Sequence, residues 1–290
     1  MDWDSVDERL IKCGELLLSL EFLKRYDEEL KTMNGGKEGH PFTLTQSHVM
    51  FLAVVPYLFG FSYRHLEGFA RALNCLVPRL PSSDYSGLRR RILELDLSLY
   101  ESLRLSDDPV VIAVDSTGGR VHKAGGRVER VHGKKKRYVE IHLAVDVETK
   151  QALAMIVTTD GTHDSRVFPE LLRKTERHVK VSKAIMDGAY DNSKVYQTLE
   201  QKGIEAVIKP RRNSRSDTPL EPRRRAVIEY KRLGYRCWAD RKGYGKRWSV
   251  ETAYSTFKRT FGEYCMAKTM KNITKELTTK AYIYNTLINL

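Results

Sequence analysis

Apolar residues recur at helical spacing through most of the first hundred residues. Leucines repeat in this way between Asp4 and Met33, and Asn34-Gly35-Gly36 ends the pattern. Further helices are expected over residues 43–58, 62–73 and 84–103, the last of them capped from the polar cluster at 82–84. The pattern predicts an all-α domain over residues 1–105.

Two of these helices flank a turn at residues 78–83, and the second carries Arg89, Arg90 and Arg91. This arrangement fits a helix-turn-helix that binds DNA. A plain helical bundle predicts the same pattern, so both interpretations stand.

From about residue 106 the pattern changes to strands alternating with helices. Residues 110–114 form a continuous β-branched run that ends in Asp115, which is typical of a buried strand. We then expect a hairpin (138–147 and 151–158), a helix (165–178), a strand (181–186), a helix (192–202), a strand (206–208) and helices at 246–261 and 273–288. The fold class is α/β (α+β), with a mixed sheet flanked by helices over residues 106–290.

Composition supports a folded protein. The 290 residues are 41% hydrophobic and 9% aromatic, enough for a sizeable core. The longest apolar stretch, residues 51–61, is shorter than the roughly 20 residues of a membrane span. The acidic N-terminus does not resemble a secretory signal, so a cytoplasmic location is expected. The cysteines are too far apart for a CxxC unit and are interpreted as separate thiols: Cys13, Cys75, Cys237 and Cys265.

The net charge of +13 is concentrated in two segments. Residues 119–140 carry a net charge of +6 and residues 208–247 carry +10, so the remainder is near −3. Such segments suit a polyanion, because neutralised phosphates release counterions. Two solubilising loops are the alternative. Both segments are rich in Gly, Ser and Pro and are expected to be mobile. Pro210, Pro219 and Pro222 should break any long helix in the second.

Two predicted buried strands each end in an aspartate followed by small residues. These are Asp115 in VDSTGG and Asp187 in MDGAYD. Open α/β sheets bind ligands at this edge, and Mg²⁺ favours carboxylates and phosphate oxygens. An aspartate that caps the next turn is the alternative for each residue.

A third carboxylate, Glu251, lies on a predicted helix near Tyr244, Arg247 and Lys258. At 100° per residue, Arg247 and Lys258 fall on the same side of the helix as Glu251. A neighbouring apolar stripe should dock the helix on the sheet and turn Glu251 toward the two aspartates; it consists of Val250, Tyr254, Phe257 and Phe261. A salt-bridged helix face is the alternative.

With these motifs the chain resembles the DDE transposases of bacterial and archaeal insertion sequences that carry a Y-R-E-K signature. The family's acidic triad matches Asp115, Asp187 and Glu251, and its signature Tyr, Arg and Lys match Tyr244, Arg247 and Lys258. The resemblance covers residues 110–290 and implies a ribonuclease-H-like core. Some relatives carry a large β-rich insertion before the glutamate helix. This chain has only about 40 residues at that place, 208–247, so no full insertion domain is expected.

The resemblance implies a cytoplasmic, nucleoid-associated prokaryotic enzyme that cleaves element ends and joins the 3′-hydroxyl to target DNA. The three carboxylates would hold two Mg²⁺ ions, with Mn²⁺ able to substitute, and act in an in-line displacement. Double-stranded DNA is the expected partner, in a complex with a homodimer. The expected DNA contacts are Tyr244, Arg247, Lys258, Arg223, Arg224 and Arg225. The alternatives are a ribonuclease-H-like nuclease without strand transfer and a transposase-derived DNA-binding protein.

Other polar residues receive simpler interpretations. Asp164 and Asp191 precede predicted helices and are expected to be N-caps. Asp146, beside the hairpin turn, is expected to be solvated. Three histidines share no metal-ligand spacing and are interpreted as phosphate contacts or bystanders: His122, His132 and His163.

Overall fold

A computed structural model of the chain describes residues 3–17, 19–121, 138–159 and 161–290. The chain divides into two compact units. One contains Met1–Ser98 and Tyr282–Leu290, and the other contains Leu99–Ala281. Among the described residues, no helix is long and apolar enough to cross a membrane.

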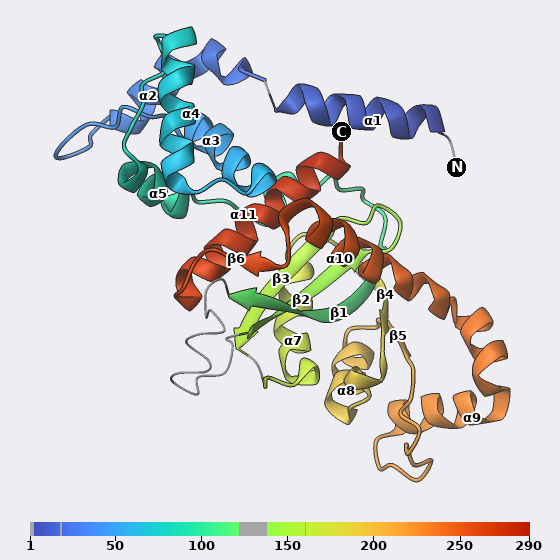
Figure 1. Cartoon of the computed structure of the whole chain (residues 1–290). Coiled ribbons are helices and arrows are strands. Elements are labelled where there is room, and N and C mark those ends of the chain that lie inside the picture. Colours follow the sequence, from blue (N-terminus) through green and yellow to red (C-terminus); the bar gives the residue numbers. More distant parts are fainter. Residues whose placement is uncertain (1–2, 18, 122–137, 160) are drawn as a thin grey trace, which may run out of the picture. The chain divides into compact units, whose positions relative to one another are not determined.

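The first unit is built from helices (Figure 1). They are α1 (Trp3–Leu16), a 3-10 helix (Glu21–Arg25), α2 (Tyr26–Asn34), α3 (Gln46–Phe59), α4 (Tyr63–Leu76), α5 (Tyr85–Glu94) and the end of α11 (Met270–Ile288). The side chains of Thr45, Ser62 and Asp84 cap α3, α4 and α5 by accepting backbone N–H groups.

The single helix expected between Asp4 and Met33 is wrong, because the chain turns after Leu16. Tertiary contacts outweigh helical periodicity there. Tyr26 is buried and donates its hydroxyl to the Thr43 carbonyl at 2.9 Å. The helix expected over 84–103 also ends earlier, at Glu94.

The arginines on α5 differ in their surroundings. Arg91 donates to the Leu44 carbonyl at 3.1 Å, and its guanidinium lies 4.3 Å from the centre of the Phe42 ring. Arg89 and Arg90 are exposed. Arg91 therefore links α5 to the segment before α3, while its two neighbours face solvent.

The second unit contains a six-stranded mixed sheet with the path β3-β2-β1-β4-β5, in which β6 also pairs with β1. Its strands are β1 (Val110–Val121), β2 (Tyr138–Asp146), β3 (Ala152–Thr159), β4 (Val181–Met186), β5 (Glu205–Ile208) and β6 (Tyr264–Cys265). Its helices are the 3-10 segments Leu99–Ser102, Gly188–Tyr190 and Tyr244–Arg247, with α7 (Asp164–Thr175), α8 (Ser193–Gln201), α9 (Glu221–Lys242), α10 (Trp248–Phe261) and most of α11. The expected mixed sheet flanked by helices is confirmed.

The first strand is longer than expected, so Asp115 lies inside β1 and not at its end. Antiparallel pairing with β2 continues as far as Arg120 and Tyr138, which extends β1 through its glycines. The parallel pairing of β1 with β4 nevertheless stops at Val114 and Met186. Asp115 and Asp187 therefore both follow the last paired positions of adjacent strands.

The two faces of the sheet carry different helices (Figure 1). Side chains alternate along β1, so Ser116, opposite His142, points away from the face of Asp115, opposite Leu143. The helices α7 and α8 cover the Ser116 face with a buried core. The helix α10 packs on the other through the predicted stripe, whose members are all buried: Val250, Tyr254, Phe257 and Phe261.

The second basic segment is not a loop throughout, because α9 occupies more than half of it. Pro222 lies in the first turn of α9, where a missing N–H costs no hydrogen bond. Gly234 interrupts the helix with φ 71°. The expectation that prolines exclude a long helix is therefore wrong. Of the first basic segment, residues 122–137 lie outside the described residues.

Candidate active site

Arg247 joins two of the predicted carboxylates. Its Nη1 donates to Oδ2 of Asp115 at 2.9 Å, and its Nη2 donates to Glu251 one helical turn away. Because Arg247 precedes α10 and Asp115 lies in β1, these bonds fix the helix start against the strand. Glu251 therefore lies on the same face of the sheet as Asp115.

Asp187 completes the acidic group from the end of β4. One of its carboxylate oxygens accepts the Ala189 N–H at 2.8 Å, which orients the side chain. The pKa of Asp115 is raised, mainly by burial and also by the negative charges of Asp187 and Glu251, although the Ser116 N–H and Arg247 oppose the shift. The three predicted carboxylates thus lie near one another, close enough for the charges of Asp187 and Glu251 to raise the pKa of Asp115.

Tyr254 fixes the strand that carries Asp115. Its hydroxyl oxygen lies 2.8 Å from the carbonyl oxygens of Asp115 and Ile141 and accepts the Leu143 N–H at 3.1 Å. The side chain is buried, and burial raises the pKa of the phenol well above its usual value. The predicted stripe therefore contains a polar tether as well as apolar contacts.

A basic hollow of about 700 Å³ adjoins Asp187. Its cationic lining residues are Lys209, Arg211, Arg212, Lys231 and Arg247, and its aromatic ones are Tyr230 and Tyr244. Burial raises the pKa of Tyr244 to about 12, so its hydroxyl stays protonated at neutral pH. The hollow combines positive charge with ring surfaces next to a candidate metal ligand.

Three of the other expected DNA contacts lie elsewhere. Lys258 lines a smaller hollow farther along α10, next to Thr117 and Gly118. Arg225 is exposed and pairs with Glu200. Arg224 is partly buried near the start of α9.

Arg223 is a structural residue, because its guanidinium is held by the buried Asp191. Arg223 Nε lies 2.7 Å from Asp191 Oδ1. Asp191 also accepts the Arg211 N–H at 3.0 Å and a bond from Ser214. Burial raises the pKa of Asp191, but these donors outweigh it and the pKa ends lower than usual. The N-cap of α8 is Asn192, so the N-cap expected at Asp191 is wrong.

Two further expectations about acids are also wrong. Asp146 is buried and organises the hairpin turn by accepting the Glu148 N–H at 3.0 Å and the Thr149 hydroxyl at 2.8 Å. Asp164 is the first residue of α7, and the N-cap is His163, which makes no side-chain cap. His122 and His132 lie outside the described residues.

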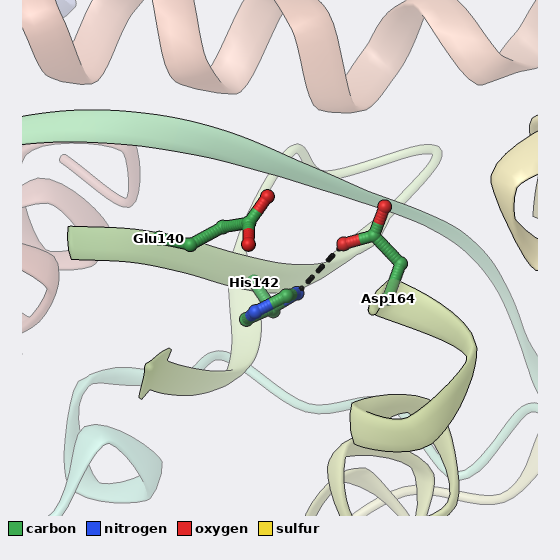
Figure 2. Close-up of side chains that lie close together, drawn as sticks. All are labelled: Glu140, His142 and Asp164. Carbon is green, nitrogen blue, oxygen red and sulfur yellow. Dashed lines mark ion pairs between the residues drawn. The ribbon is translucent and has the colours of Figure 1, made fainter. Parts of the chain in front are cut away.

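The structure reveals one group that sequence analysis missed. Figure 2 shows Glu140 and His142 from β2 and Asp164 from α7 with their polar ends together. Burial raises the pKa of Asp164, but polar contacts with His142 and Ser116 outweigh it and leave the pKa lower than usual. Glu140 and His142 are two residues apart in a predicted strand, so the sequence indicates that they point to the same face. It does not indicate that Asp164 on α7 lies beside them.

Comparison with known families identifies the chain. A family model described as "Transposase DDE domain" matches residues 106–286, and a second model with the same description matches residues 11–124. The chain therefore belongs to the DDE transposase family. Its function is that of a transposase.

Two solved transposase structures are similar at low levels. A piggyBac transposase synaptic complex with hairpin DNA gives a TM-score of 0.43 at 12% identity, covering 96% of this chain and 74% of that chain. The Drosophila P element transposase strand transfer complex gives 0.37 at 13% identity, covering 66% and 46%. The family assignment rests on the family models, because these scores are low.

The donor set of the acidic group fits the divalent metal ions that DDE transposases use. Carboxylate oxygens from Asp115, Asp187 and Glu251 are the hard ligands that such ions prefer. The mutual repulsion that helps to raise the pKa of Asp115 is relieved by a bound cation. Arg247 already places one positive charge between two of these side chains.

Proposed function

We propose that this transposase cleaves the ends of an insertion sequence and joins the freed 3′-hydroxyl to target DNA, using Asp115, Asp187 and Glu251 to hold two Mg²⁺ ions. Mn²⁺ is expected to substitute. The proposal is supported chiefly by Arg247, which donates hydrogen bonds to both Asp115 and Glu251, close to Asp187. In a prokaryotic cell the protein would act in the cytoplasm at the nucleoid.

Asp115, Asp187 and Glu251 would hold the ions, which would supply activation of the attacking oxygen and stabilisation of the leaving oxygen in an in-line displacement at phosphorus. The residues of the chain prepare that site. Tyr254 fixes the backbone of Asp115, and the Ala189 N–H orients Asp187. Arg247 holds Glu251 toward β1, and its guanidinium is suited to a bidentate phosphate contact when DNA enters.

The DNA strand that contains the cleavage site is proposed to follow the basic hollow beside Asp187. Lys209, Arg212 and Lys231 supply positive charge along it, and Tyr244 supplies a ring surface. Lys258 would contact the backbone on the other side of Glu251. These contacts position the strand and do not select its sequence.

Strand transfer requires two element ends in one complex, so a homodimer bound to two DNA ends is proposed. Light scattering with and without a DNA end measures the mass of the complex. A complex with one protomer and one end that still completes strand transfer would exclude the dimer.

The proposal is tested with DNA taken from both sides of the reading frame. A pre-cut end with a free 3′-hydroxyl is incubated with a target plasmid, Mg²⁺ and the full chain, and joined products are separated by electrophoresis. Joined product is expected. Nicking without joining would indicate a nuclease, and binding without nicking would indicate a DNA-binding protein.

A further inference from the structure

A mixed histidine and carboxylate group lies behind the acidic site, on the α7 face of the sheet. Glu140, His142 and Asp164 each offer one ligand atom, and these atoms lie within 4.8 Å of one another (Figure 2). His142 is fully buried. Because Ser116 and Asp115 point to opposite faces of β1, this group is separate from the site of Asp115, Asp187 and Glu251.

The contact between His142 and Asp164 has the spacing of two ligands on one ion. His142 Nδ1 lies 3.2 Å from Asp164 Oδ1. Zinc bonds of about 2.0–2.2 Å in a tetrahedron place neighbouring ligand atoms about 3.4 Å apart. The carboxylate of Glu140, which is only partly buried, lies within 4.8 Å of a ligand atom of each of these two residues.

The hydrogen bonding of this group is incomplete. Within the described part of the chain, His142 Nδ1 and Asp164 Oδ1 are buried, face each other at 3.2 Å as an ion pair, and make no hydrogen bond of good geometry. His142 Nε2 lies 3.0 Å from the Thr158 hydroxyl, which accounts for the other ring nitrogen. Nδ1 faces the Asp164 carboxylate, and either a proton on Nδ1 or a metal ion between the two atoms satisfies this arrangement.

A second buried polar atom lies near the same group. The Tyr190 hydroxyl has no hydrogen-bond partner among the described residues, and its side chain is 1% exposed. Burial raises the pKa of this phenol, and the negative charge of Asp164 adds to the shift. A buried hydroxyl without a partner is costly, and a water molecule bound to an ion beside it would accept its hydrogen bond.

We infer that Glu140, His142 and Asp164 bind one transition-metal ion, for which Zn²⁺ is the best match. One imidazole nitrogen and two carboxylates suit zinc, whereas Mg²⁺ favours an all-oxygen shell. The ion would tie β2 to the first turn of α7. Glu140 also accepts the Ser116 hydroxyl at 3.2 Å, so the ion would brace β1 next to Asp115.

The test measures zinc binding by the full chain with the acidic site disabled. The background variant Asp115→Asn/Glu251→Gln removes two ligands of the proposed Mg²⁺ site. After chelator treatment, the protein is dialysed against Zn²⁺ in excess Mg²⁺, and zinc is counted by elemental mass spectrometry. One Zn²⁺ per chain is expected, together with a thermal midpoint that rises with zinc concentration.

Variants in this background identify the ligands. Asp164→Asn and Glu140→Gln should each weaken zinc binding by about tenfold or more, comparable to the effect of removing other metal-site groups. Glu170→Gln, on the exposed side of α7, is the matched control and should bind zinc as the background does. Circular dichroism confirms that each variant is folded, and His142→Gln is compared only if it is.

Two outcomes would overturn the inference. One is the absence of zinc above the dialysis buffer in the background variant, which would make the pair of His142 and Asp164 a simple ion pair. The other is equal zinc affinity in Asp164→Asn, Glu140→Gln and Glu170→Gln. Neither result bears on strand transfer, so the inference can fail while the proposed function holds.

Discussion

Arg247 and Asp115 are 132 residues apart in sequence, yet Arg247 Nη1 donates to Asp115 Oδ2 at 2.9 Å. The same guanidinium bonds Glu251. One cation therefore holds together two carboxylates from different elements of the fold. This contact makes Arg247 a competitor for the metal ions as well as a candidate phosphate ligand.

Replacing Arg247 with alanine should destabilise the metal-free protein. Removal of the charge-assisted hydrogen bonds leaves the repulsion between Asp115 and Glu251 unopposed, which should lower the free energy of unfolding by about 1–3 kcal/mol. Added Mg²⁺ should then stabilise Arg247→Ala more than the wild type. Urea unfolding in EDTA and in Mg²⁺ measures both effects.

The matched control for this prediction is Arg215→Ala. Arg215 forms an exposed pair with Asp217, so its removal should leave the free energy of unfolding nearly unchanged. Equal Mg²⁺ stabilisation of the wild type and Arg247→Ala would contradict a role for Arg247 as competitor.

Asp115→Asn should stabilise the metal-free protein at neutral pH. The pKa of Asp115 is raised in the folded state, chiefly by burial, so the folded protein binds this proton more tightly than the unfolded chain. Ionised Asp115 therefore lowers stability above its folded pKa, and this effect disappears below the unfolded pKa. The gain from the substitution should shrink as pH falls through that window.

Thermal unfolding in EDTA across a pH series measures this gain. Asp217→Asn is the control with the opposite sign, because hydrogen bonding to Arg215 lowers the pKa of Asp217. A lower midpoint for Asp115→Asn than for the wild type at neutral pH would show that Asp115 is not under electrostatic strain.

Tyr254→Phe should lower both stability and cleavage. The substitution leaves the Leu143 N–H and the Asp115 carbonyl without the hydroxyl, at a cost of about 1–3 kcal/mol. Tyr196→Phe is the control, since the hydroxyl of the buried Tyr196 donates to the Ile208 carbonyl across a long 3.5 Å. Equal reductions in the two variants, measured by urea unfolding and nicking, would argue against a tether specific to Asp115.

Arg212→Ala and Lys231→Ala should weaken DNA binding to a similar extent for all sequences. Both exposed side chains line the hollow beside Asp187. Each duplex phosphate that the variant no longer neutralises should flatten the slope of log affinity against log salt by about 0.9. Fluorescence anisotropy over a salt series measures the slope, and Arg173→Ala on α7 should leave it unchanged. Unchanged slopes for Arg212→Ala and Lys231→Ala would exclude the hollow as a DNA path.

Local patterns were sufficient to predict most elements of the second unit. The β-branched run before Asp115 and the apolar run before Asp187 predicted both strands, and the stripe around Glu251 predicted the helix that docks on the sheet. When two neighbouring strands of a sheet end at the same edge, the residues that follow them lie close together. The sequence was therefore sufficient to predict that the acidic residues lie near one another.

Long-range contacts were not predictable in the same way. An aspartate before a helix has the pattern of an N-cap, and only the fold shows that Asp191 instead binds Arg223, 32 residues later. The group of Glu140, His142 and Asp164 likewise requires the pairing of β2 with α7. The extension of β1 past Gly118 and Gly119 depends on pairing with β2, which outweighs the low strand propensity of glycine.

The central claim is that Asp115, Asp187 and Glu251 act together in DNA cleavage. Its most direct test is the Mg²⁺-dependent nicking of element-end DNA by Asp115→Asn, Asp187→Asn and Glu251→Gln, with the exposed Glu263→Gln as control. Nicking should be abolished in all three variants and unchanged in Glu263→Gln, while each variant still binds DNA. Nicking at the wild-type rate by any one of the three would contradict the claim.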